Sequence, residues 1–152
     1  MSARRGKGLG FTLIELMVTI TVLIILAFIA VPNYNSFVAN QRIKTASFDV
    51  MSAMVLARSE ALKRNTNVTV TPTTGSDWAS GWSVTAGATT LNQQAAFRNL
   101  TITGPASLSY TSNGRLPPGT AAASISISST GATPRCISID PSGQPNSKKE
   151  AC

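Results

Sequence analysis

Few residues of this chain could carry out chemistry on a substrate. The 152 residues include no histidine and two cysteines, and 12% of them are charged. Without histidine the chain lacks the commonest general base and metal ligand, and two cysteines cannot form a four-cysteine zinc site. The sequence also contains no phosphate-binding glycine loop and no nucleophile elbow. We therefore expect that the protein is not an enzyme and binds no cofactor or metal.

One carboxylate is unusual because of its neighbours. Glu15 is the only ionisable residue in the apolar segment of residues 11–31. About 20 such residues cross a bilayer core as a helix, and the segment is too long for the apolar part of a signal peptide. We therefore predict a retained transmembrane helix. A carboxylate there costs about 2.5–3.5 kcal/mol, so Glu15 either snorkels to the headgroups or pairs with a cation on a neighbouring chain.

The charges that flank this segment predict its orientation. Arg4, Arg5 and Lys7 precede it, and the next basic residue along the chain is Arg42. Positive charge stays on the cytoplasmic side of a membrane, so we expect a cytoplasmic N-terminus. In a bacterium the rest of the chain would then lie in the periplasm, where disulfides persist.

The two cysteines, Cys136 and Cys152, form the second chemical candidate. An isolated pair in an oxidising compartment is expected to form a disulfide. The bond would close a loop of about 15 residues, which corresponds to about 3 kcal/mol of loop entropy. It would hold the polar tail of residues 141–151 against the last strand. A metal or redox role is not expected, because there is neither a C-x-x-C motif nor a histidine.

The elements that position these residues begin with a long helix. Helical periodicity continues over residues 33–64. Although Pro32 disfavours helix locally, we predict one helix over about residues 12–64 that is kinked near Pro32. Asn65 is expected to end it. The membrane segment would thus continue into an amphipathic helix over residues 32–65.

One face of the amphipathic part should cover a core. Its apolar residues recur three and four positions apart: Ile43, Ala46, Val50, Ala53, Ala57 and Ala61. Four more are expected to widen this stripe: Phe48, Met51, Val55 and Leu62. We interpret Arg58 and Glu60 as solvated or weakly paired charges on this helix.

After Asn65 the sequence changes to short alternating segments rich in Thr, Ser, Gly and Val. They predict strands over residues 67–71, 81–85, 97–103, 108–112, 124–128 and 135–140, with 89–93 as a weaker candidate. Asn113-Gly114 is the strongest hairpin signal among the turns. Six or seven short strands on a helix make an α+β domain over residues 66–152, as an antiparallel sheet or sandwich. Trp78 and Trp82 are expected to pack beneath its first hairpin.

The N-terminal motif resembles a known family. Residues 4–10 read R-R-G-K-G-L-G, and residues 11–16 read F-T-L-I-E-L. This pattern resembles the leader and first residues of type IV prepilins and type II secretion pseudopilins. The resemblance implies that residues 1–10 are a leader, that a prepilin peptidase cleaves between Gly10 and Phe11, and that it methylates the new amine of Phe11. It also implies that Glu15 binds the Phe11 ammonium of an adjacent subunit.

Later segments resemble a subgroup of that family, the GspH/FimT/FimU minor pilins. The similar segments are residues 56–65 (L-A-R-S-E-A-L-K-R-N), 81–84 (G-W-S-V), 113–115 (N-G-R) and the hairpin over 135–143. The resemblance implies a pilin-like fold and a structural role in a type IV pilus or a type II secretion pseudopilus. Implied partners are other pilins, a prepilin peptidase, an assembly platform and membrane lipid. The implied location is the inner membrane and then the filament.

The positive charge raises an alternative function, DNA binding during natural transformation. The chain has 13 Lys and Arg against 6 Asp and Glu. A basic surface can bind DNA phosphates without reading sequence, and Arg135, Lys148 and Lys149 are the candidate contacts. Some FimT-like relatives bind DNA through a G-R-x-R pattern near the C-terminus, whereas residues 143–146 here read G-Q-P-N. We therefore favour a solvated basic face.

Overall fold

The structure is a computed structural model that describes residues 10–152, except for the side chains of residues 29–33. The predicted leader, with Arg4, Arg5 and Lys7, lies outside the described residues apart from Gly10. The chain divides into two compact units, Met1–Asn35 and Ser36–Cys152, and each is considered by itself.

A single helix, α1 (Leu13–Arg64), supplies the described helical part of both units. Its end agrees with the prediction, because Asn65 has a φ of 49° and the Thr66 N–H donates to the Ala61 carbonyl at 3.3 Å. These two features form a left-handed helix cap. The helix runs through Pro32, and the kink there stays a prediction. In the part of the chain that the structure describes, no helix qualifies by length and apolarity as a membrane span.

Within the second unit, α1 buries one face against the sheet. The six residues predicted for the stripe, from Ile43 to Ala61, are all buried. The predicted widening was wrong for Phe48, Val55 and Leu62, whose side chains are more than half exposed. These three residues recur every seven positions, which places them in one row on the face opposite the stripe. Met54 is instead fully buried beside the stripe, which the sequence analysis missed.

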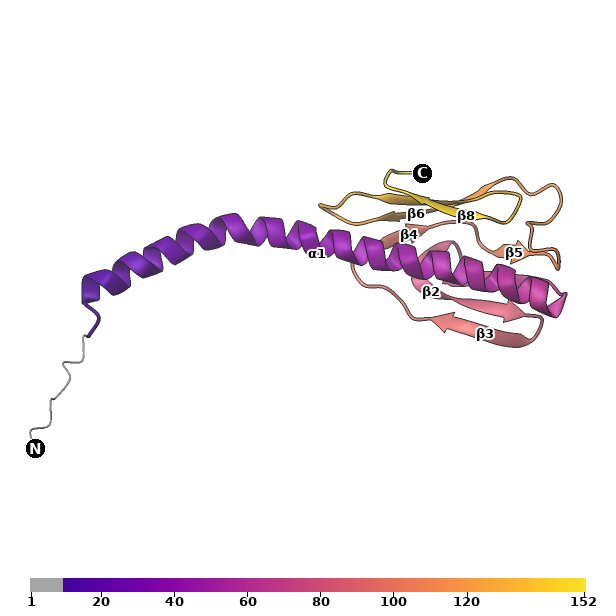
Figure 1. Cartoon of the computed structure of the whole chain (residues 1–152), viewed down its shortest axis with the longest axis horizontal. Helices are drawn as coiled ribbons and strands as arrows, with labels where there is room; N and C mark the ends of the chain where they lie inside the picture. Colours follow the sequence, from indigo (N-terminus) through magenta and orange to yellow (C-terminus); the bar gives the residue numbers. More distant parts are fainter. Residues whose placement is uncertain (1–9) are drawn as a thin grey trace, which may run out of the picture. The chain divides into compact units, whose positions relative to one another are not determined.

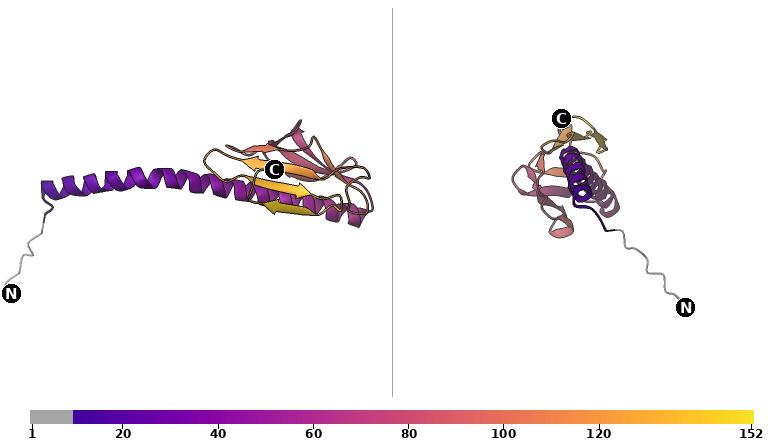
Figure 2. Two further views of the ribbon diagram at one scale, coloured as in Figure 1. Left: turned by 90° about the horizontal axis from the view of Figure 1, so that it is seen from above. Right: turned by 90° about the vertical axis from the view of Figure 1, so that its left-hand side faces the viewer.

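The sheet contains eight strands in the described residues, not six or seven. They are β1 (Val68–Thr74), β2 (Asp77–Ala86), β3 (Thr89–Gln94), β4 (Thr101–Thr103), β5 (Leu108–Tyr110), β6 (Ala123–Ser128), β7 (Arg135–Ile139) and β8 (Pro145–Lys148). All strand pairs are antiparallel, in the order β5-β1-β2-β4-β6-β7-β8, with β3 paired to β2. In the second unit the strands lie along one side of α1 (Figures 1 and 2). This arrangement confirms the α+β fold.

Two tryptophans form the centre of the core between α1 and the sheet. Trp78 and Trp82 are buried, and their ring centroids lie 5.8 Å apart. The indole N–H of Trp78 donates to the Pro105 carbonyl at 2.9 Å. As expected, both rings are packed in the core.

The Asn113-Gly114 turn forms, but it does not join two paired strands. The Gly114 N–H donates to the Thr111 carbonyl at 2.8 Å. β5, which precedes the turn, pairs only with β1 among the described strands, and β6 lies farther across the sheet. Pro117 and Pro118 follow the turn and cannot donate to a strand ladder. The hairpin expected from this signal was therefore wrong.

Candidate functional site

The predicted processing residues, Gly10 and Phe11, precede α1, and the predicted assembly residue, Glu15, lies in its first turn. Thr12 caps the helix, because its Oγ1 accepts a hydrogen bond from the Glu15 N–H at 3.3 Å and its carbonyl accepts one from the Leu16 N–H at 3.2 Å. A threonine followed three residues later by glutamate is the sequence signature of a helix start. Glu15 therefore lies where the helix dipole favours negative charge. The sequence analysis missed this capping role, although the T-x-x-E spacing indicates it.

Residues 11–28 have no apolar cover within the first unit. Every large apolar side chain in this range, from Phe11 to Phe28, is between 48% and 79% exposed. Exposed apolar surface of this extent marks a site for another molecule or for lipid. A side chain added at Gly10 would meet nothing within 4 Å. The first turn is thus accessible to other molecules from all sides.

The two cysteines are joined by a disulfide, with their Cα atoms 4.9 Å apart. The tail between them is more ordered than the sequence indicates, because residues 145–148 form β8 and pair with β7. The Ser47 and Ser147 hydroxyls lie 3.1 Å apart and connect β8 to α1. The tail is therefore held by the covalent bond, by the strand ladder and by α1.

The three predicted basic contacts are separated into two environments. Lys148 forms an ion pair with Glu150, with Nζ and Oε1 3.6 Å apart. Arg135 and Lys149 instead line a cavity of about 380 Å³ with Lys44 of α1. Asn40, Gln41 and Thr133 complete the lining. We call this cavity the cationic hollow; the sequence analysis assigned Lys44 no role.

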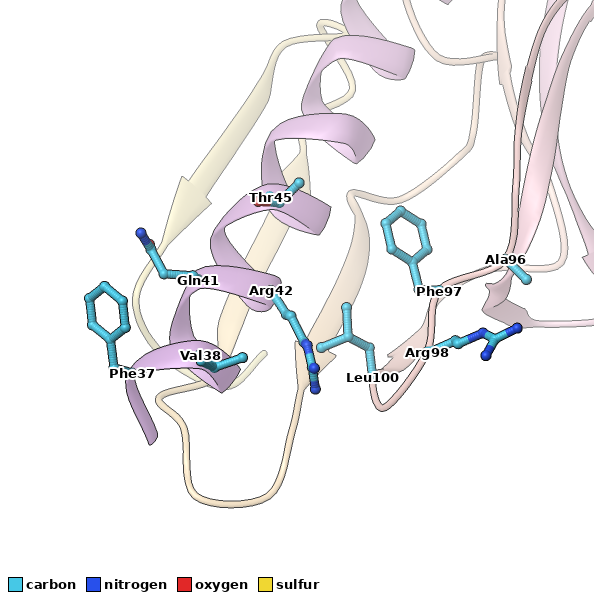
Figure 3. A pocket seen from close by; sticks show the side chains of 9 residues that line it. All are labelled: Phe37, Val38, Gln41, Arg42, Thr45, Ala96, Phe97, Arg98 and Leu100. Carbon is cyan, nitrogen blue, oxygen red and sulfur yellow. The ribbon is translucent and has the colours of Figure 1, made fainter. Parts of the chain in front are cut away.

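A second cavity, the apolar hollow, adjoins the other side of the same helical turns. Its volume is about 470 Å³, and it lies between α1 and the loop before β4. Figure 3 shows Leu100 and Phe97 on that loop opposite Arg42 of α1. Gln41 lines both hollows. An apolar surface and a cationic surface therefore meet at one helix turn.

A third cavity, of about 230 Å³, contains acceptor groups. It is lined by Asp49, Ser52, Ala53, Leu56, Trp82, Asn92 and Gln94. Burial raises the pKa of Asp49 above its usual value. The indole N–H of Trp82 is buried without a hydrogen-bond partner among the described residues.

The charged end of α1 contains a local ion-pair network. Glu60 accepts a hydrogen bond from Arg64 and lies 3.7 Å from the Lys63 ammonium. The hydrogen bond from Arg64 lowers the pKa of Glu60. These pairs lie within one helix and at its surface, which agrees with weakly paired charges. Arg58 is close enough to Tyr110 for its charge to oppose the rise in the pKa of Tyr110 that burial causes.

Two glycines of the motifs have a structural explanation. Gly81 of the G-W-S-V segment has a φ of 88°, and an added Cβ would lie 2.3 Å from the Gln94 carbonyl oxygen. Gly143 has a φ of 81°, and its Cβ would lie 2.1 Å from the Gly114 oxygen. Other side chains are excluded at both positions by backbone contacts. The N-G-R turn and the last hairpin are therefore in contact with each other.

The described residues contain no group of three His, Cys, Asp or Glu side chains that could hold a metal ion. Their chemistry thus consists of a capped and exposed apolar helix, a disulfide-held edge and two adjacent cavities. These features provide surfaces for binding.

Comparisons with known proteins agree with this description. The family model of the type II transport protein GspH matches residues 46–143. A crystal structure of the type IV minor pilin FimU from Pseudomonas aeruginosa (strain PAO1), in space group P21, matches with a TM-score of 0.65 and 26% identity. The match covers 74% of this chain and 92% of that chain. A second crystal form of FimU, in space group P65, gives a TM-score of 0.61 and 26% identity, with 69% and 91% covered. No curated protein gives a significant sequence match.

Proposed function

This chain belongs to the family of the type II transport protein GspH, and we propose that residues 10–15, at the start of α1, control its processing and its entry into a filament. It is a minor pilin or pseudopilin, a structural subunit that interacts with other pilins. The observation that carries the proposal is the exposure of every large apolar side chain in residues 11–28. Such a surface needs lipid or other helices around it.

Before assembly, the apolar segment of residues 11–31 lies in the bacterial inner membrane. The basic leader stays in the cytoplasm, and the domain that follows lies in the periplasm. This topology is supported by the three leader cations and by the disulfide, because disulfides persist in the periplasm. After assembly, the same helix lies among the helices of other subunits.

Cleavage by the prepilin peptidase after Gly10 creates a new ammonium on Phe11, which the same enzyme methylates. Glu15 then binds the ammonium of a neighbouring subunit. Phe11 precedes α1 and Glu15 lies in its first turn, so a neighbour shifted along the helix axis can bring its Phe11 ammonium to Glu15. In low dielectric an unpaired carboxylate is costly, which favours the pair over two separate charges.

The processing step is tested with Gly10→Val. Because a side chain at Gly10 meets nothing within 4 Å, the variant should fold normally and fail only in cleavage. Mass spectrometry of membrane-extracted protein should give N-methyl-Phe11 as the first residue of the wild type and an uncleaved chain for the variant. A wild-type chain that keeps Met1 in cells with active peptidase would refute the processing step.

The assembly step is tested with Glu15→Gln and Glu15→Ala. Both should be inserted and cleaved normally and then be missing from sheared filaments, because both remove the charge that binds Phe11. Glu150→Gln is the matched control, because it removes an exposed carboxylate of the tail that pairs with Lys148 alone among the described residues. Normal entry of both Glu15 variants into filaments would refute the pairing and leave Glu15 as a carboxylate at the helix N-terminus, where the helix dipole favours it.

A further inference from the structure

We propose that the cationic hollow and the apolar hollow together bind an acidic segment of a neighbouring filament subunit, one that carries a bulky apolar residue beside its carboxylates. The inference rests on the proposed filament role, because it requires a neighbouring subunit. It adds the surface that is used and the chemistry of the partner.

The first observation is a set of three cations without counterions. Lys44, Arg135 and Lys149 line one cavity, and none of them forms an ion pair with a described residue. In the register of β7 and β8, Cys136 lies opposite Lys148. Lys149 directly follows β8, and it lines the same cavity as Arg135. Like charges that line one cavity repel each other.

The second observation is that covalent structure holds these cations together. The disulfide joins Cys136, which directly follows Arg135, to Cys152, three residues after Lys149. Glu150 cannot be assigned to the hollow, because it pairs with Lys148. An edge that keeps two cations adjacent despite their repulsion is prepared for an anion. Arginine and lysine both donate charge-assisted hydrogen bonds to carboxylates.

The third observation favours the carboxylates of a protein segment over the phosphates of DNA as the bound anion. The apolar hollow adjoins the cationic hollow at Gln41, which lines both cavities. Val38, Phe97 and Leu100 provide its apolar surface, and Arg42 and Arg98 also line it. The phosphate backbone of DNA offers no side chain to fill such a cavity, whereas a protein segment can place a leucine or phenylalanine beside a glutamate. An acidic and apolar segment thus satisfies both cavities at once.

The experiment measures peptide binding to the full chain in detergent micelles at about 0.15 M salt. The probe is a fluorescent helical peptide with glutamates on one face and a leucine beside them. Lys149→Gln and Arg135→Gln should each weaken its binding about tenfold. Lys148→Gln is the matched control, because it removes the same charge one residue away from the hollow, and its effect should stay below about twofold.

Two further variants test the details of the site. Lys149→Glu should no longer bind the peptide with glutamates. It should instead bind a peptide in which lysines replace those glutamates. Leu100→Ser should weaken the binding of the peptide that contains leucine. It should not change the binding of a peptide that has serine in place of that leucine. Circular dichroism of each variant checks that the fold is retained, and exposed Lys149 tolerates substitution best.

Several results would overturn the inference. Failure of the peptide to bind the wild type would refute the site, and so would a loss of binding in Lys148→Gln as large as that in Lys149→Gln. Displacement of the peptide by short-chain phosphatidylglycerol would show that the site binds lipid headgroups. Duplex DNA that binds more tightly than the peptide, with the same dependence on Lys149, would show that the site binds DNA. None of these results bears on the Glu15 test. If Glu15 variants fail to enter filaments and the peptide does not bind, the hollow is refuted and the proposed function is retained.

Discussion

The two halves of α1 have similar helical geometry and opposite relations to the rest of the chain. Residues 11–28 expose all their large apolar side chains, whereas residues 43–61 bury a continuous face against Trp78, Trp82 and the sheet. In the first half the apolar residues have no partner within the first unit. The apolar residues of the first half are therefore suited to contact with lipid or other molecules. Those of the second half are suited to packing in the protein's own core. Mutations should separate these two roles.

The largest expected effect is the loss of a core ring. Trp78 is fully buried, contacts Trp82 and donates a hydrogen bond to Pro105. Trp78→Ala should lower the free energy of unfolding by about 3–5 kcal/mol, because it leaves a cavity. Ile24→Ala is the control from the first half and should leave it unchanged. Denaturant unfolding of the full chain in detergent, followed by near-ultraviolet circular dichroism, measures both. Equal losses would contradict the division of roles.

The second effect concerns the edge of the domain. Cys136→Ser combined with Cys152→Ser opens a loop with a sequence separation of 16 residues. The free energy of unfolding should fall by about 3 kcal/mol on the loop-entropy estimate. Amide hydrogen exchange should accelerate in β8 first and leave β1 and β2 protected at low denaturant. Wild type treated with reductant serves as the control. Uniform acceleration across the sheet would indicate that the bond supports the whole core.

The third effect depends on pH and comes from a buried hydroxyl. Burial raises the pKa of Tyr110 to about 12 from 10.0, and the charge of Arg58 opposes this rise. The unfolded chain therefore releases this proton at lower pH than the folded chain. Stability is complete below about pH 10 and decreases as the pH rises toward 12, by about 2–3 kcal/mol in total.

Tyr110→Phe should remove this alkaline loss. At pH 7 the variant should be at least as stable as the wild type, because the hydroxyl has no hydrogen-bond partner among the described residues. Tyr34→Phe is the control, since Tyr34 is exposed in the first unit. Urea unfolding at pH 7 and pH 11 measures the difference. An unchanged alkaline loss in Tyr110→Phe would show that another group is responsible.

The comparison also explains which features the sequence could predict. The bounds of α1 follow from its cap residues and from Asn65, and its buried face follows from helical periodicity. β8 could not be predicted, because Pro145-Asn146-Ser147-Lys148 has no apolar alternation. Its pairing depends on β7, on the disulfide and on the contact of Ser147 with Ser47. These contacts link residues far apart in the chain.

The surface sites show the same limit. The sequence identified Arg135, Lys148 and Lys149 as basic candidates, but it did not distinguish Lys149 in the cavity from Lys148 in its pair with Glu150. That distinction depends on strand register, which requires the structure. Lys44 joins the group from a distant part of the chain. The cap formed by Thr12, in contrast, was readable from local spacing.

The smallest expected effect on stability comes from the second half of α1, which has both a buried apolar face and an exposed apolar row. Phe48 belongs to the second half of α1, yet it is 73% exposed, and with Val55 it forms the outward row opposite the buried stripe. If burial alone decides stability, Phe48→Ser should change the free energy of unfolding by no more than about 0.5 kcal/mol. Val50→Ala, two residues away and fully buried, should cost several times more.

The same pair of variants should give the reverse result in filaments. Phe48→Ser should be depleted from sheared filaments if the outward row packs on a neighbour, because the apolar row resembles residues 11–28 in lacking an internal partner. Val50→Ala should enter in proportion to its folded amount. Unfolding curves and filament counts on the same preparations measure both quantities. A large loss of stability in Phe48→Ser would show that the row is part of the core. Covered and uncovered apolar residues would then lie at different ends of α1 and not on different faces of its second half.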